Sequence, residues 1–181
     1  MTTHSAWLHQ IIERSRKQKS MAERAFNQLT DAELHRRPSP TFNSVATIMR
    51  HLGGNMLSRW TDFLTTDGEK PNRNRENEFA DWTGTGDELI AHWNRGWSAF
   101  FDTLEKLTDE DCTKTIFIRT QPHTVPQAII RALDHAAYHV GQIVFLSRLI
   151  HEGDWTWLTI APGKSDAFNR QLGLDDSKNA R

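Results

Sequence analysis

The sequence DHAAYHVGQI spans residues 134–143, near the C-terminal end of the chain. It lies within a longer segment, residues 124–151, whose apolar residues recur at the 3.6-residue spacing of an α-helix. The residues that this spacing places on one side of the helix are Ile129, Ile130, Leu133, Ala136, Ala137, Val140, Ile143 and Val144. The segment is therefore predicted to be a long helix that packs one face against the rest of the protein.

Two histidines on this predicted helix are four residues apart. The rings of His135 and His139 therefore lie one turn above each other, displaced by about 40° around the helix axis. Two imidazoles at that spacing can bind one metal ion from a single helix. The chain has nine histidines, so such a pair also arises readily among ordinary, partly exposed histidines. A third ligand on another helix would favour the metal site.

His51 is the candidate third ligand. Residues 44–66 are predicted to form a helix, and His51 borders its apolar face, with Asn55 following on the same side. If this face packs against the helix that carries His135 and His139, the three rings can meet. Three neutral imidazoles leave a fourth position for water or substrate, which is the open type of zinc site found in enzymes.

The remaining segments predict an all-α protein. Further helices are expected at residues 6–29 and at about 86–107, with a short extended excursion at residues 113–125, before the last helix. The second and third long helices are joined by a long polar connection, residues 68–82, which Pro71, Phe79 and Trp82 are expected to anchor. No linker or internal repeat divides the chain. We therefore expect one domain, residues 1–181, folded as a four-helix bundle.

Two features near His51 allow more than one interpretation. Gly53 and Gly54 each cost about 1 kcal/mol of helix propensity relative to alanine, which indicates a close approach by another helix or by a ligand beside the metal. Packing of another helix is the simpler explanation. In the long connection, Arg73 and Arg75 are interpreted as solvated or salt-bridged, and contact with an anionic substrate stays open.

Several longer motifs resemble a known family. MRHLGGNMLSRWTDFL at residues 49–64 and DHAAYHVGQIVFL at 134–146 resemble the DinB/YfiT-like superfamily of metal-binding four-helix bundles. RWTDFLTTDGEKPNRNRENEF at 59–79 and APGKSDAFN at 161–169 resemble its DUF1572 branch. The resemblance implies that His51, His135 and His139 bind a divalent metal and that the protein is a homodimer. Some relatives are transferases or isomerases that use a low-molecular-weight thiol, whereas the DUF1572 branch has no assigned activity.

Other metal and hydrolase mechanisms lack their residues. A His-Glu-x-x-His protease motif would need glutamate where the chain has Ala136, and no paired Glu-x-x-His motifs or Gly-x-Ser-x-Gly elbow occur. Two classes remain. One is a metal-dependent enzyme, a thiol-dependent transferase or hydrolase-like, with Asn55, Tyr138 and Gln142 as candidate substrate-pocket residues. The other is a noncatalytic metal- or ligand-binding module. All-imidazole sites suit zinc, nickel, copper or iron, and of these we expect zinc or nickel.

Composition limits the partners. The formal net charge of −1 provides no electrostatic footprint for nucleic acid. Cys112 is the only cysteine, which precludes an intrachain disulfide, and its acidic neighbours disfavour a reactive thiolate. The sequence has no apolar run of the length of a signal peptide or membrane span. We therefore expect a cytoplasmic protein that binds a small molecule.

Overall fold

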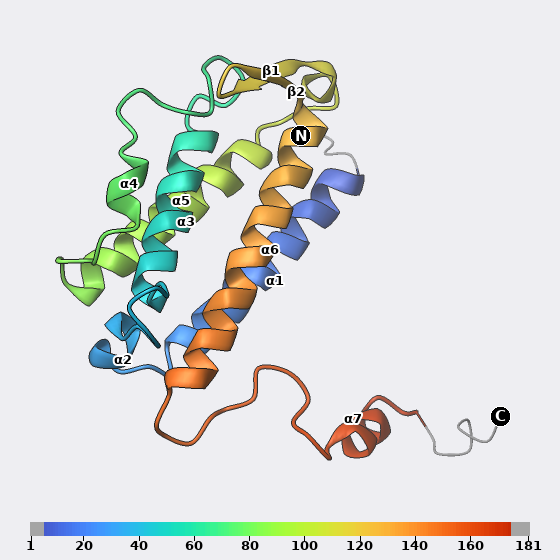
Figure 1. The fold of residues 1–181 in the computed structure, drawn as a ribbon. Helices are drawn as coiled ribbons and strands as arrows, with labels where there is room; N and C mark the ends of the chain where they lie inside the picture. The colour runs from blue at the N-terminus through green and yellow to red at the C-terminus, as the bar shows by residue number, and fades with distance from the viewer. Residues whose placement is uncertain (1–5, 175–181) are drawn as a thin grey trace.

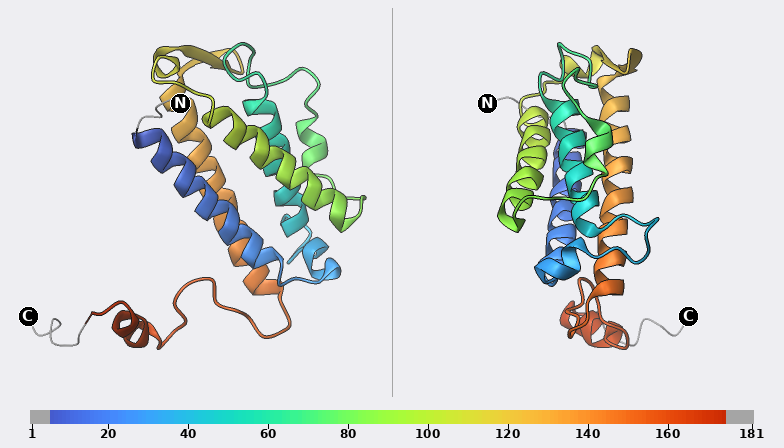
Figure 2. Two further views of the ribbon diagram at one scale, coloured as in Figure 1. Left: turned by 180° about the vertical axis from the view of Figure 1, so that it is seen from behind. Right: turned by 60° about the vertical axis from the view of Figure 1, so that its left-hand side comes forward.

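The computed structural model describes residues 6–174 and is mostly helical, as predicted. Its long helices are α1 (Ala6–Phe26), α3 (Val45–Trp60), α5 (Gly86–Leu104) and α6 (Val125–Ile150), which lie side by side (Figures 1 and 2). Shorter elements are α2 (Asp31–His35), α4 (Arg75–Glu78), the 3₁₀ turn η1 (Asp111–Thr113), the strands β1 (Thr115–Ile118) and β2 (Gln121–Thr124), and α7 (Ser165–Gln171). No described helix is both long enough and apolar enough to cross a membrane.

The core lies between two helix pairs. The most extensive packing is of α3 on α5 and of α1 on α6, and α3 also packs against α6. Helix α5 contributes a face of large aromatic side chains, and Trp93, Trp97 and Phe100 are almost fully buried in it. The sequence places these apolar residues at helical spacing. Large aromatic side chains bury more apolar area per residue than smaller ones, so this face contributes strongly to the core. The packing of α3 on α6 is what brings the histidines of the two helices together.

Helix α6 has nearly the predicted bounds, and only part of its predicted face is buried. Thr124 caps its N-terminus with a capping box, Pro126 lies in the first turn, and the helix ends at Ile150. The prediction that Ile130 and Ala137 belong to the buried face was wrong, because both are exposed. Ile129, Ala136, Val140 and Ile143 of the predicted face are buried, and the buried face extends to Ala128, His139 and Leu146 on the histidine side. The helix is thus turned so that its histidines face α3.

Three helices end earlier than predicted: α1 at Phe26 instead of residue 29, α3 at Trp60 instead of 66, and α5 at Leu104 instead of 107. After α3 the chain turns back at Asp62, whose φ is 48°, and the ring of Phe63 stacks on Trp60 with centroids 4.5 Å apart. The Ser58 hydroxyl donates to the carbonyl of Gly68 at 2.8 Å. Burial of Phe63 and this hydrogen bond hold the returning chain against α3.

The long connection after α3 is ordered and runs back along the outside of that helix (Figure 1). It contains α4, which Asn74 caps. We expected Pro71, Phe79 and Trp82 to anchor it. Phe79 stacks on His51 with centroids 4.5 Å apart, and Trp82 packs against the core. Pro71 is exposed, so that part of the expectation was wrong. The connection therefore forms one wall beside His51.

The predicted extended excursion is an antiparallel hairpin of β1 and β2. Arg119 and Thr120 form its two-residue turn, and both have positive φ, 53° and 62°. Residues other than glycine rarely adopt a positive φ, but type I′ turns require it at both central positions. The Asp67 carboxylate accepts hydrogen bonds from the backbone N–H groups of Arg119 and Thr120, at 2.8 and 2.7 Å. These bonds hold the hairpin turn against the start of the long connection.

Candidate metal centre

Three histidine rings from two helices converge on one point. His51 comes from α3, and His135 and His139 come from consecutive turns of α6. The Nε2 atom of His135 lies 3.4 Å from Nε2 of His51 and 3.1 Å from Nε2 of His139. Two nitrogens bound at about 2.0–2.1 Å to one tetrahedral zinc lie about 3.3 Å apart. The three residues can therefore hold a metal ion, as their ligand atoms lie within 4.8 Å of one another.

The hydrogen bonds of Nδ1 determine which nitrogen of His51 and His139 carries the proton. The Nδ1–H group of His51 donates to Glu78 at 2.9 Å, and that of His139 donates to the side-chain oxygen of Gln142 at 2.8 Å. Each ring thus keeps an unprotonated Nε2 that points toward His135. A single proton on Nε2 of His135 can satisfy only one of these two lone pairs. A shared cation satisfies all of them, so the donor set fits a metal.

Burial keeps His135 and His139 neutral, as metal ligands must be. His51 and His139 are buried, and His135 is partly buried. Burial, together with the neighbouring charges of His139 and His51, lowers the pKa of His135 to about 3. Burial and the charge of His51 lower the pKa of His139 to about 4. Both rings therefore present free nitrogens at neutral pH without having to lose a proton first.

Glu78 is held in place by Arg73. The guanidinium of Arg73 donates through Nε to Oε1 and through Nη2 to Oε2 of Glu78, both at 2.8 Å. Burial raises the pKa of the Glu78 carboxyl, but the bonds from Arg73 and His51 outweigh it, and the pKa is lowered overall. Glu78 is therefore an ionised acceptor behind His51, the arrangement that orients many metal-binding histidines.

The two glycines of α3 have different roles. A Cβ on Gly53 would lie 2.8 Å from the ring of His92 on α5, and a Cβ on Gly96 of α5 would lie 2.7 Å from Gly53 itself. Gly53 thus permits the close packing of α3 on α5, which was the simpler of the two explanations. A Cβ on Gly54 would lie 2.6 Å from Oε1 of Glu78. Gly54 makes room for the carboxylate behind His51.

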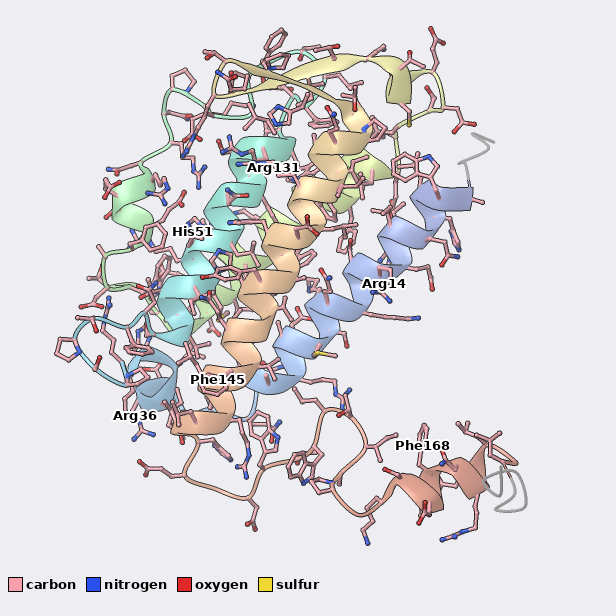
Figure 3. All side chains as sticks on the ribbon, turned by 45° about the vertical axis from the view of Figure 1, so that its right-hand side comes forward. Arg14, Arg36, His51, Arg131, Phe145 and Phe168 are labelled. Atoms are coloured by element: carbon pink, nitrogen blue, oxygen red, sulfur yellow. The ribbon has the colours of Figure 1, made fainter. Side chains whose placement is uncertain are left out.

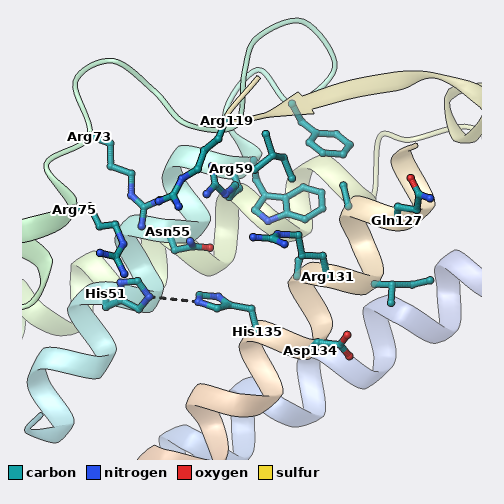
Figure 4. Close-up of a pocket in the computed structure, with 16 residues that line it drawn as sticks. His51, Asn55, Arg59, Arg73, Arg75, Arg119, Gln127, Arg131, Asp134 and His135 are labelled. Carbon is teal, nitrogen blue, oxygen red and sulfur yellow. Dashed lines mark hydrogen bonds between the residues drawn. The ribbon is translucent and has the colours of Figure 1, made fainter. Parts of the chain in front are cut away.

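A cavity of about 660 Å³ opens beside the histidines (Figure 4). His51 and His135 line one end of it, between the hairpin, the long connection and α6. Figure 3 shows that His51 and Arg131, from α3 and α6, border the same face of the molecule. The volume is within the range of small-molecule sites. A ligand in this cavity can reach an ion held by the three rings.

The three candidate pocket residues lie in different places. Asn55 lines the cavity. Gln142 contacts Nδ1 of His139 and so lies behind the ring. Tyr138 is 62% exposed, is not among the cavity-lining residues, and packs its ring edge against His139. His92 of α5 does not belong to the three-histidine group, and its Nε2 contacts the carbonyl of Arg50 at 3.0 Å.

Sequence reasoning assigned no role to Glu78 or Arg131. Glu78 belongs to a polar connection whose path cannot be read from helical periodicity. The one local signal was Gly54, a glycine inside a helix, against which Glu78 packs. Arg131 lies one turn before His135 on α6 and lines the cavity. Its i, i+4 spacing from His135 was visible in the sequence, since residues at that spacing share a helix face.

A family model described as "Protein of unknown function (DUF1572)" matches residues 2–164. The chain belongs to the DUF1572 family. No curated protein shows significant similarity to it. The part of this DUF1572 protein that matches contains all three histidines, Glu78 and the arginines around the cavity, and it ends just before α7. The family description assigns no activity, so a function for this DUF1572 protein must be argued from the site.

Proposed function

We propose that this DUF1572 protein binds a divalent metal ion through His51, His135 and His139 and leaves one coordination position open to the cavity. We further propose that it is a four-helix bundle of the DinB/YfiT-like superfamily. The observation that carries the proposal is the convergence of the three Nε2 atoms, two of which carry lone pairs fixed by Glu78 and Gln142.

The open position favours an enzyme. Among residues 6–174, no cysteine, aspartate, glutamate or further histidine joins the three-histidine group, so a fourth ligand has to come from solvent or substrate. An ion in such a site supplies Lewis-acid chemistry, lowering the pKa of a bound water or thiol. Asn55 lies at the wall of the cavity, where its amide can orient the ligand. We propose a metal-dependent transferase, using a low-molecular-weight thiol, or a hydrolase-like reaction.

The alternative is a noncatalytic metal- or ligand-binding module. It is favoured by Ala136, which stands where a metalloprotease motif has its general base, and by Glu78, which is bonded to His51 and Arg73 and does not line the cavity. In this role the ion joins α3 to α6. The two alternatives differ in their fourth ligand, because an exchangeable water or substrate is needed only for chemistry.

The experiment is metal analysis of protein purified without an affinity tag. We expect one divalent ion per chain, zinc or nickel. His135→Ala should lower the metal affinity by more than roughly 10–100-fold, which is the loss typical when only a group hydrogen-bonded to a ligand is removed. The control is His123→Ala, in the hairpin and outside the three-histidine group. If the wild-type protein takes up no zinc or nickel, or if both variants bind as tightly as the wild type, the proposal is wrong.

We also propose a cytoplasmic location and a homodimer. These proposals extend the resemblance of the sequence to its superfamily. Fractionation of cells that express the protein and light scattering of the purified protein are the respective tests.

A further inference from the structure

Arginines from four separate segments line the cavity beside the histidines. Arg59 comes from α3, Arg73 and Arg75 from the long connection, Arg119 from the hairpin turn and Arg131 from α6. In Figure 4 the side chains of Arg73, Arg75 and Arg119 reach down above His51, while Arg131 reaches toward the same space from the opposite side. Like charges repel, so gathering them requires compensation from carboxylates or from a ligand.

One carboxylate is shared by three of these arginines. Oε2 of Glu69 lies 3.0 Å from Arg59, 3.3 Å from Arg73 and 3.0 Å from Arg119. Arg73 also pairs with Glu78, at 2.8 Å. Among residues 6–174, Arg59 and Arg119 form no ion pair other than the one with the shared Glu69.

Two arginine groups have donors to spare. Arg131 forms no ion pair among residues 6–174, and Asp134, the carboxylate that lines the same cavity, pairs with none of its arginines there. Nη1 of Arg59 is buried and has no hydrogen-bond partner in that part of the chain. A buried donor of a charged group without a partner is costly, so a ligand acceptor at this point stabilises the site.

Apolar side chains line another part of the cavity wall. Trp60 lines it from the end of α3, Phe63 from the turn that follows, Ile118 from β1 and Ile130 from α6. A ligand that fits has an anionic group for the arginines and a less polar body for this wall. The volume, about 660 Å³, is far more than one phosphate ion occupies and suits a small organic molecule.

We propose that the cavity binds a small organic molecule through a carboxylate or phosphate group, held by Arg131 together with Arg59 and Arg119. The remainder of the molecule extends toward His51 and His135. The planar guanidinium group can donate two parallel hydrogen bonds to a carboxylate or to a phosphate, so the same arginines can bind either group. This inference deepens the proposed function by naming the substrate class, but the arginines bind the anion whether or not the histidines hold a metal.

The test is calorimetry on metal-free protein at low ionic strength. The probes are inorganic phosphate, pyrophosphate and succinate, with neutral succinamide as the uncharged comparison. We expect at least one of the anions, and not succinamide, to bind, and the preferred anion identifies carboxylate or phosphate as the natural group. Arg131→Gln should weaken that binding about tenfold to a hundredfold, the value of one charged hydrogen-bonding group. Arg131 is exposed on α6, so the variant should fold normally.

The matched control is Arg148→Gln, on the same helix but beside Trp155 and Trp157 instead of the cavity. It should bind the anions as the wild type does. The inference is overturned if no anion binds to the metal-free protein, or if the two variants bind alike. Zinc titration of Arg131→Gln separates the two proposals: it should take up zinc like the wild type. A wild-type protein that binds anions but no metal would overturn only the proposed function.

Discussion

Replacement of Glu78 by glutamine removes the charge behind His51 and leaves the size of the side chain unchanged. The Nδ1–H group of His51 now donates to Oε2 of Glu78 at 2.9 Å, in a site where the glutamate side chain is 9% exposed. With an amide in its place, the ring loses its charged acceptor and becomes a weaker base at Nε2. Loss of such a partner typically lowers metal affinity about 10–100-fold, or about 1.4–2.7 kcal/mol.

The same substitution weakens the contact with Arg73, whose side chain is 4% exposed. Breaking a buried ion pair typically destabilises a protein by about 3–5 kcal/mol. Here Arg73 keeps Glu69 at 3.3 Å and the amide oxygen as acceptors. We therefore expect a smaller loss in the free energy of unfolding, about 1–3 kcal/mol.

Zinc affinity is measured by competition with a chromophoric chelator at neutral pH, and stability by urea unfolding of the metal-free protein. The control is Glu76→Gln, two residues away on α4, where the carboxylate is 90% exposed. The control should bind zinc like the wild type. If Glu78→Gln remains folded and binds zinc as tightly as Glu76→Gln, Glu78 does not support the metal site.

Gly54→Ala probes the same bond from the opposite side. The added Cβ would lie 2.6 Å from Oε1 of Glu78, so the carboxylate has to move away from His51. Zinc affinity should fall even though alanine favours the helix by about 1 kcal/mol. An alanine variant that is more stable and binds zinc normally would show that Gly54 does not make room for Glu78.

Three further predictions follow from other parts of the structure. The pKa values of His135 and His139 are lowered to about 3 and 4, so below pH 6.5 the unfolded chain binds more protons than the folded one. The free energy of unfolding of the metal-free protein should therefore fall as the pH is lowered from 6.5 to about 4.5, by at most about 1.4 kcal/mol per pH unit for each ring. A free energy of unfolding in urea that does not change over this range would contradict the burial of the rings. Asp67→Ala removes the acceptor that holds Thr120 at a positive φ and should lower the free energy of unfolding by about 1.5–3 kcal/mol, whereas Asp67→Asn, which keeps one acceptor oxygen, should lose less. If the homodimer forms through the exposed face of α6, Phe145→Glu should yield monomers in light scattering, since Phe145 is 65% exposed there (Figure 3); a wild-type monomer would refute the homodimer itself.

The three-histidine group could be predicted because the sequence patterns that indicate it each lie within one helix. The i, i+4 spacing of His135 and His139 and the position of His51 at the edge of an apolar face are properties of single helices. Only the packing of α3 on α6 was needed to join them. The apolar periodicity that predicted helices at about 86–107 and at 124–151 is equally local, and α5 and α6 form there, although α5 ends at Leu104.

The surroundings of the three-histidine group could not be predicted in the same way. Glu78 and Arg73 lie in a polar connection with no periodicity, and their position depends on where Phe79 and Trp82 pack. The early end of α3 depends on the burial of Phe63 after the chain has turned back. These are tertiary contacts, which override the local preference of the chain for a longer helix.

X-ray absorption at the metal edge of the zinc- or nickel-loaded protein tests whether the three histidines bind one ion. We expect three imidazole nitrogens at about 2.0–2.1 Å and one exchangeable light-atom ligand, with loss of one imidazole in His51→Ala. Fewer than three imidazoles in the wild-type protein, or an unchanged spectrum in His51→Ala, would contradict a metal centre built from α3 and α6.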